Sequence, residues 1–492
     1  MKRSLPTQPV RRLPLVFATA LSLLLAARCG MAQQLDLPDF GSSADLTLSS
    51  AQEHRLGREF MKSVRESLPV VDDPLLTDYL ESLGNQLVAA SGTGSGNYDF
   101  FLVDDPTVNA FAGPDGHIGV FSGLVLTSGT ESELAAVMAH EIAHETQHHL
   151  RRMIEDQKRS SIPATAALIA AAILGAQVNA DLGMAAMAGV QAAAAQRQIN
   201  LTRENEKEAD RIGIASLAAA GFEPYAMPGF FERLAKTSRI YESSAPEFLR
   251  THPVTTNRIA DALGRAADYG HKQKPDDLRF HLARARLRER SFHNPEKAIA
   301  HFRSQLESKR YGNETATRYG YALALAYGGR IKDARAIAED LLAKEPNQAE
   351  LIILAARLEA KSGAEDRALK TLQTAVGLRP TNTPLRLAYA DLLMATGHAD
   401  RALKTLEDIS RRRPADTLIY QKMSDAALKS GQKSATHRYR AERLHAEGDL
   451  EPAILQLEIA LRQPGLSYQD AAGIQARLET FRQEKKDAKK EH

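Results

Sequence analysis

A spacing of 34 residues recurs through the second half of this 492-residue chain. Glycines and prolines share this spacing, at Gly329, Gly363, Gly397, Gly431, Pro346, Pro380 and Pro414. A glycine suits the turn between two helices and a proline ends the second helix, so each period predicts one helix–turn–helix unit. Such a unit buries its apolar face only against its neighbours, so the spacing predicts an extended stack of helix pairs.

This period, with a small residue at the turn and a proline after the second helix, is typical of tetratricopeptide repeats. Asn294-Pro295 indicates an earlier degenerate unit, and Gly448 restarts the pattern out of phase. We therefore expect four to five repeats over residues 275–485 and a charged tail at 486–492. Arrays of this kind usually bind peptide segments on a concave face, and the alternative is that this one only stabilises or spaces the rest of the chain.

The first half has a mixed pattern. Residues 46–92 look helical, and strand-like runs follow at 98–103, 108–112 and 117–126. The turn Pro114-Asp115-Gly116 separates the last two runs and predicts a hairpin. The whole sequence therefore predicts an α+β fold, with a mainly helical domain and a small β-sheet followed by an all-α tetratricopeptide solenoid.

The first 32 residues have the features of a secretory signal. A basic start precedes the apolar run 13–27, and Gly30-Met31-Ala32 offers a cleavage site after Ala32. The only cysteine, Cys29, lies inside this segment, and its lipidation is the alternative to simple cleavage. The remaining chain lacks cysteine, which excludes disulfides and thiolate metal ligands. The 63 basic and 61 acidic residues nearly balance, which argues against nucleic acid as a main partner.

The stretch His140-Glu141-Ile142-Ala143-His144 carries the strongest chemical signal. Two histidines four residues apart lie on one helix face and can bind a single metal ion, while Glu141 can act as a general base. Alone, the stretch fits equally well a solvated helix face that carries two histidines. Its position in a segment with helical periodicity, residues 131–157, favours a zinc site.

A third ligand is needed, and two kinds of residue could supply it. Gln147 and Leu150 occupy the glycine and histidine positions of the longer histidine-rich zinc motif, which excludes that class. His148 and His149 lie on the same predicted helix, too far along it to wrap one ion, so we interpret them as surface or supporting residues.

The other candidate is the acidic run 203–210. Glu206 and Asp210 share one helix face, so Glu206 could bind the metal while Asp210 accepts a hydrogen bond from a ligand histidine. Glu208 points elsewhere on the helix and is a weaker candidate. Taken alone, such a run is more often an exposed helix start.

H-E-x-x-H followed by E-x-x-x-D resembles the HtpX-like zinc metallopeptidases, a gluzincin group. Asn109-Ala110-Phe111-Ala112 is similar to the edge strand of that family, and Thr251-His252-Pro253 with Arg258 is similar to its H-P-x-x-x-x-R element. Asp115 stands where the family commonly has glycine, which is a mild departure. The resemblance implies a zincin-type metalloprotease domain, which we expect over residues 33–270.

This resemblance also implies roles for individual residues. One Zn²⁺ would be held by His140, His144 and Glu206, with Glu141 as the general base and Asp210 as a supporting catalytic residue. His252 and Arg258 would stabilise the oxyanion, or His252 would occupy the open metal position at rest; the plain alternative is a helix-start histidine. Asn109, Ala110, Phe111 and Ala112 would pair with the substrate backbone.

A signal, this protease domain and a repeat tail together resemble the periplasmic, β-barrel-assembly subgroup of the family. The resemblance implies a periplasmic zinc metalloendopeptidase that degrades misfolded or stalled outer-membrane β-barrel proteins and contacts the barrel-assembly machinery. Association of this enzyme with the outer membrane is compatible with the resemblance. One alternative is a repeat-based chaperone or assembly adaptor with a silent protease domain. Another is a zinc protein without peptidase activity.

The alanine-rich segment 163–196 lies between the two predicted ligand helices. Its length would permit a membrane span, but alanine contributes little to insertion and polar residues interrupt it. We expect a helical hairpin packed on the protease as a lid over the site, with a peripheral membrane contact as the alternative.

Overall fold

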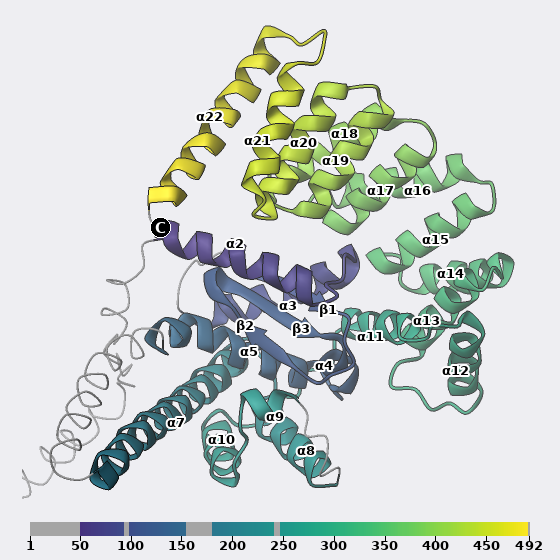
Figure 1. The fold of residues 1–492 in the computed structure, drawn as a ribbon. Helices are drawn as coiled ribbons and strands as arrows, with labels where there is room; N and C mark the ends of the chain where they lie inside the picture. The colour runs from purple at the N-terminus through teal and green to yellow at the C-terminus, as the bar shows by residue number, and fades with distance from the viewer. Residues whose placement is uncertain (1–49, 93–97, 154–179, 241–246, 491–492) are drawn as a thin grey trace, which may run out of the picture. The chain divides into compact units, whose positions relative to one another are not determined.

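A computed structural model describes residues 50–92, 98–153, 180–240 and 247–490 (Figure 1). The predicted signal with Cys29, and residues 163–179 of the alanine-rich segment, lie outside the described residues. A mainly helical half with a three-stranded sheet precedes a helical solenoid, which confirms the expected α+β class. The helices of the first half are α2 (Ser50–Ser67), α3 (Pro74–Ala90), α4 (Ser122–Thr127), α5 (Glu131–Thr146), α7 (Ala180–Ala219), α8 (Ala226–Ile240), α9 (Glu247–Thr251) and α10 (Thr256–Tyr269).

The sheet has the strand order β1-β3-β2, with β1 (Asp99–Val103) parallel to β3 (His117–Phe121) and β2 (Ala110–Ala112) antiparallel to it. The predicted hairpin is therefore confirmed. Its turn, η2 (Pro114–Gly116), holds Asp115 at φ 63°, a left-handed conformation that aspartate tolerates. The prediction of a strand as far as residue 126 is wrong, because α4 begins at 122; a short apolar run without alternation suits a buried helix as well as a strand.

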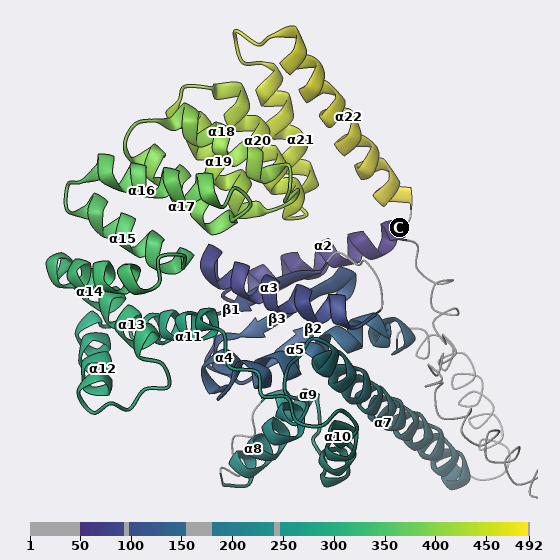
Figure 2. The same ribbon diagram turned by 180° about the vertical axis from the view of Figure 1, so that it is seen from behind.

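Both faces of the sheet are buried. Phe100 and Leu102 belong to the main core with α3 and α5, whereas Phe101 and Val103 pack with Met61 of α2 on the other face. Alternation of side chains along β1 explains this division, since successive residues point to opposite faces. The helices covering the two faces can be followed in Figures 1 and 2.

Helix α5 starts where the sequence predicts but ends earlier. Thr130 caps it by accepting a hydrogen bond from the Glu133 amide. The predicted continuation to residue 157 is wrong, because α5 ends at Thr146 and His148 has a φ of 52°. A separate helical segment then begins at His149, so the chain changes direction within two residues.

Helix α7 is 40 residues long and continues from the alanine-rich segment into the acidic run. Residues 180–196, expected as an arm of a hairpin, thus belong to the same helix as Glu206 and Asp210. Within the described ranges, no helix is long and apolar enough to cross a membrane.

The solenoid consists of antiparallel helix pairs, as the 34-residue period predicts (Figure 2). Its helices are α11 (Leu278–Arg290), α12 (Pro295–Glu307), α13 (Glu314–Tyr327), α14 (Ile331–Lys344), α15 (Ala349–Lys361), α16 (Glu365–Leu378), α17 (Thr383–Ala395), α18 (Ala399–Ser410), α19 (Thr417–Lys429), α20 (Lys433–Ala446), α21 (Leu450–Leu461) and α22 (Tyr468–Lys490). The four periodic glycines have φ between 76° and 81° at the turns within the pairs, where glycine avoids the steric cost of other residues.

Helix α3 connects the sheet-containing half to the solenoid. Arg286 of α11 donates to Asp73, the N-cap of α3, at 2.7 Å. Farther along the solenoid, Arg413 forms a bidentate pair with Glu81 of α3 through two N–H groups. Leu75 of α3 also belongs to an apolar core of the solenoid. Ion pairs and apolar packing therefore both fix the solenoid to α3.

Candidate metal centre

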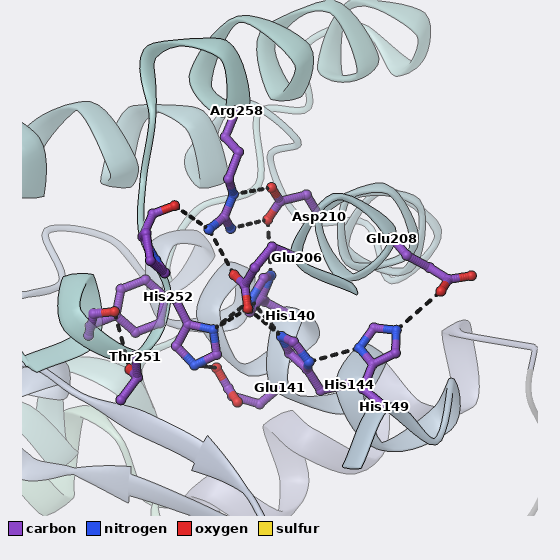
Figure 3. Close-up of polar contacts among 12 residues, drawn as sticks. His140, Glu141, His144, His149, Glu206, Glu208, Asp210, Thr251, His252 and Arg258 are labelled. Carbon is purple, nitrogen blue, oxygen red and sulfur yellow. Dashed lines mark hydrogen bonds and ion pairs between the residues drawn. The ribbon is translucent and has the colours of Figure 1, made fainter. Parts of the chain in front are cut away.

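Two helices distant in sequence bring the candidate ligands together. Gly213 lies where α7 passes α5, and a Cβ there would meet the His140 amide nitrogen at 3.2 Å. A larger residue would have to push these neighbours apart, so the glycine favours this close approach. Asp210 and Glu206, one and two turns earlier on α7, consequently lie beside His140 of α5 (Figure 3).

Four side chains present ligand atoms to one point: His140, His144, Glu206 and His252. His140 Nε2 lies 3.0 Å from His144 Nε2 and 3.4 Å from His252 Nδ1. Glu206 Oε1 is 3.3 Å from His144 Nε2 and 2.9 Å from His252 Nδ1. The predicted ligand set is thus assembled, with His252 as a fourth donor.

The donor set and its spacing fit a zinc ion. Tetrahedral ligands about 2.1 Å from zinc lie about 3.4 Å from one another, close to the 2.9–3.4 Å separations here. Imidazole nitrogens and a carboxylate oxygen are the usual zinc donors when cysteine is absent. A divalent cation would also neutralise the close approach of three nitrogen lone pairs to one another.

His140 is held from behind by a carboxylate. Its Nδ1 lies 3.0 Å from Asp210 Oδ1, which leaves Nε2 free to face the metal position. Arg258 in turn donates to both oxygens of Asp210 at 2.8 Å and approaches Glu206 Oε2 at 2.7 Å. It also donates to the Pro253 carbonyl oxygen at 3.0 Å, and its guanidinium lies over the Phe231 ring. The structure therefore places Arg258 behind the ligands, as a positioning residue, rather than at a substrate carbonyl.

Burial and charge act in opposite directions on these groups. Burial alone would lower the pKa of His140, but the carboxylates of Asp210 and Glu206 outweigh it and raise that pKa to about 10. Burial would raise the pKa of Glu206, but hydrogen bonds from the three histidines hold it well below its usual range. Burial lowers the pKa of His144, which favours the neutral form that binds metal.

A second chain of contacts holds His144, and it passes through His149. His149 Nδ1 lies 2.8 Å from His144 Nδ1, and His149 Nε2 lies 3.2 Å from Glu208 Oε2. If His144 presents Nε2 to the metal, its Nδ1–H donates to His149, and His149 donates from Nε2 to Glu208 (Figure 3). Burial lowers the pKa of His149 to about 4, consistent with the neutral form that this chain requires.

On a continuous helix, a residue five positions after His144 would point about 140° away from it. The left-handed conformation of His148 redirects the chain and returns His149 to His144. The sequence leaves His149 as either a surface or a supporting residue and Glu208 as a weaker ligand candidate, and the prediction of an unbroken helix misses the contact between them. A non-glycine residue with positive φ has no reliable sequence signal, although histidine tolerates it better than most residues.

Glu141 is buried beside the ligands. Its Oε1 has no hydrogen-bond partner among the described residues, and the nearest ionisable neighbour, His252 Nε2, is 3.6 Å away. A carboxylate with an unused acceptor next to a metal position is suited to take a proton from water.

His252 reaches the site from the segment between α9 and α10. Its amide donates to Phe248 O at 2.7 Å, and its ring stacks on the Phe248 ring with centroids 4.9 Å apart. The Phe248 amide donates to the carbonyl oxygen of Val108, two residues before β2, at 3.2 Å. A short segment fixed at Phe248 thus supplies the fourth donor.

The predicted substrate-binding residues lie at and beside β2. Because β2 pairs only with β3 in the described sheet, it forms an edge. The Asn109 carbonyl accepts from the Phe121 amide, and its side chain accepts from the Ala110 amide. Phe111 packs edge-to-face against Phe101 and Phe121, which stiffens the strand.

Comparisons with known proteins agree with this architecture. The model of peptidase family M48 matches residues 74–266, and a tetratricopeptide-repeat model matches residues 359–426. The chain is 35% identical over 447 residues to the β-barrel assembly-enhancing protease of Escherichia coli, covering 91% of each chain. The protein of that name from Yersinia pestis is 33% identical over 446 residues, again covering 91% of each. The mitochondrial metalloendopeptidase OMA1 of Schizosaccharomyces pombe is 30% identical over 183 residues, which is 37% of this chain and 51% of that one. Similarity to the bacterial proteases therefore extends over both the sheet-containing half and the solenoid.

Proposed function

The chain belongs to peptidase family M48 and is a metallopeptidase, and from this premise we propose that it is a periplasmic, zinc-dependent endopeptidase that degrades misfolded or stalled outer-membrane proteins and assists their assembly. The observation that carries the catalytic part is the convergence of His140, His144 and Glu206 beside Glu141. The biological role rests on the names of the relatives, which are β-barrel assembly-enhancing proteases.

In the proposed site, His140, His144 and Glu206 hold one zinc ion. When bound, zinc supplies a water molecule that ionises at about neutral pH and an electrophile for the scissile carbonyl. Asp210 keeps the Nδ1 proton on His140, and His149 accepts the Nδ1 proton of His144, so both ligand rings stay in the tautomer that binds metal.

Glu141 performs the proton transfers. Its carboxylate takes a proton from the attacking water, whose oxygen forms a bond to the carbonyl carbon. Breaking of the C–N bond then requires a proton on the leaving amine, which Glu141 returns. The Oε1 of Glu141 supports this role, because it accepts no hydrogen bond from the described residues and its nearest ionisable neighbour, His252 Nε2 at 3.6 Å, would move away when substrate binds.

His252 holds the fourth position in the resting enzyme. Its Nδ1 lies as near to Glu206 Oε1 as a ligand of the same ion would. Substrate would then need to displace His252, and the displaced imidazole could serve the oxyanion, the role expected from the resemblance. Activity would therefore depend on movement of the segment after Phe248.

The edge strand with Asn109–Ala112 would pair with an extended substrate, which gives binding through the backbone with little sequence preference. Such binding suits unfolded or stalled β-barrel chains. The solenoid would contact these clients or the barrel-assembly machinery, since tetratricopeptide repeats are interaction modules. The signal proposed at residues 1–32 would deliver the chain to the periplasm.

One set of variants tests the catalytic proposal. Zinc content and hydrolysis of labelled unfolded casein would be measured for the wild type, Glu141→Gln, His140→Ala and His252→Ala, with the exposed His293 as the control His293→Ala. We expect Glu141→Gln to keep zinc and lose turnover, and His140→Ala to lose both. His252→Ala should exceed the wild type if His252 caps the site, and should lose activity with zinc retained if it serves only the oxyanion.

A chaperone or assembly adaptor with a silent protease domain is the competing function, because the solenoid makes up about as much of the chain as the protease half. The protease proposal fails if the wild type and His252→Ala both retain zinc and are inactive. Full rescue of an assembly defect in cells by Glu141→Gln would favour the adaptor.

A further inference from the structure

The arginines of α11 fall into two groups with different surroundings. Arg279, Arg286 and Arg290 form ion pairs with aspartates of the sheet-containing half. Within the described residues, Arg284 and Arg288 form no ion pair. These two lie one helical turn apart, so their charges repel each other. One face of α11 is therefore neutralised by the protein and the other is not.

The unpaired face lines a hollow of about 180 Å³. It is open to solvent and is lined by α11, α12, the connection after α12, the start of α13 and Leu126 of α4. Arg284, Arg288 and Arg310 line it together with His281 and His301, and no aspartate or glutamate is among the lining residues. Three permanent positive charges thus surround a space several times the roughly 30 Å³ of one water molecule.

This arrangement is unfavourable for the protein by itself. Burial lowers the pKa of Arg284, and the charge of Arg288 lowers it further; the same two causes lower the pKa of His301. Arg284 Nε and His301 Nε2 are buried and have no hydrogen-bond partner among the described residues. Two acids contact the lining from outside the hollow: Asp276 Oδ2 lies 3.5 Å from His281 Nε2, and Glu314 Oε2 accepts a hydrogen bond from the Tyr311 hydroxyl at 3.1 Å. Donors without acceptors are costly when buried.

The start of α13 also lines the hollow. Asn313 caps this 14-residue helix by accepting from the Ala316 amide at 2.9 Å, and both residues line the hollow with Gly312. A helix N-terminus carries a partial positive charge, but here Asn313 already accepts from the Ala316 amide and Glu314 lies in the first turn, so this helix end adds little to the arginines. The three guanidinium groups are therefore the feature that favours an anionic ligand.

We propose that this hollow binds a phosphate group, as inorganic phosphate or as a phosphate monoester. Three arginines offer more donors than the two oxygens of one carboxylate can accept, whereas phosphate has the oxygens and the charge to match them. The hollow shares no residue with the metal centre, so the proposal stands apart from the proteolytic function. A phosphate there would join α11, α12 and α13 at the beginning of the solenoid.

The test is titration of the full-length protein with inorganic phosphate, by calorimetry and by the shift in melting temperature, at constant ionic strength with chloride as the reference anion. Arg284→Gln and Arg288→Gln should each weaken binding about tenfold. Arg310→Gln removes an exposed side chain and should weaken binding without a risk to folding. Arg303→Gln, an exposed arginine of α12 outside the hollow, is the matched control.

The melting temperature of the phosphate-free protein distinguishes a ligand-binding site from a cluster of arginines that stabilises the fold. Without phosphate, Arg288→Gln should melt at or above the wild-type temperature, because it relieves repulsion. If the wild type binds phosphatidylcholine vesicles that contain phosphatidic acid and the same variants do not, the natural ligand is the phosphate monoester of a lipid. If only soluble phosphate binds, the natural ligand is the free ion. The proposal is overturned if millimolar phosphate does not bind, if the variants bind like the wild type, or if only an acidic peptide binds in an Arg284-dependent way.

Discussion

Replacing His149 by phenylalanine should weaken zinc binding although His149 is not a ligand. The ring volume is retained, but both nitrogens are lost. His144 Nδ1 then loses its contact with His149 Nδ1 at 2.8 Å, and nothing fixes the tautomer or the ring orientation of that ligand. His140 would be unaffected, because Asp210 still holds its Nδ1.

The expected loss of zinc affinity depends on the residues that hold each ligand histidine from behind. Loss of such an outer contact typically costs 10- to 100-fold in metal affinity, about 1.4–2.8 kcal/mol. The support behind His149 ends in Glu208, whose side chain is 28% exposed and shared with Arg152, so solvent screens its charge. Asp210 is 1% exposed and bonds directly to its histidine. We therefore expect about tenfold for His149→Phe and nearer 100-fold for Asp210→Asn.

Competition with a chromophoric chelator would measure both affinities, and the visible spectrum of the cobalt-substituted protein would report ligand geometry independently of turnover. His148→Asn is the matched control, because asparagine tolerates positive φ and leaves the contact between His144 and His149 intact. The reasoning is refuted if His149→Phe binds zinc as the wild type does, or if His148→Asn loses as much affinity.

Three further perturbations test other parts of the structure. Arg258→Met should leave Asp210 and Glu206 without their buried counter-charge and cost about 3–5 kcal/mol, with a larger fall in melting temperature for the zinc-free than for the zinc-loaded protein; equal falls would contradict this. Burial raises the pKa of Glu145 from 4.5 to about 7, so the fold favours its neutral form and stability should fall as pH rises through that interval. In thermal melts between pH 5 and pH 8, Glu145→Gln should reduce the change in unfolding free energy with pH, by at most about 3 kcal/mol. An unchanged pH dependence would mean that other groups cause it. Gly213→Val should push α7 away from α5 and abolish zinc binding while the solenoid still melts cooperatively; normal zinc content would refute the close approach.

Regular patterns made most of the architecture predictable. The 34-residue period is a local property repeated several times, so its helix pairs and glycine turns follow from spacing alone. The ligand helix was predictable for a similar reason, since apolar periodicity and the Thr130 cap agree on its start.

The parts that sequence reasoning missed depend on single backbone conformations or on contacts between distant segments. The end of α5 depends on one left-handed residue, His148, and the extrapolated helix therefore left open whether His149 is a surface or a supporting residue. The position of Arg258 depends on how α10 packs against α7, which spacing within either helix cannot reveal. The switch from β3 to α4 occurs within an apolar run that satisfies both periodicities.

The ligand set also ties together points that are far apart along the chain. His144 and Glu206 are 62 positions apart, so a bound ion closes a long loop much as a disulfide would, in a chain whose only cysteine is Cys29. The chain-entropy estimate for a cross-link of that length is about 4 kcal/mol. Zinc would therefore be a reversible cross-link that stabilises the fold, in addition to its part in the reaction. Chelation should make the inert variant Glu141→Gln more susceptible to an added protease such as trypsin, even though that variant has no turnover of its own to lose.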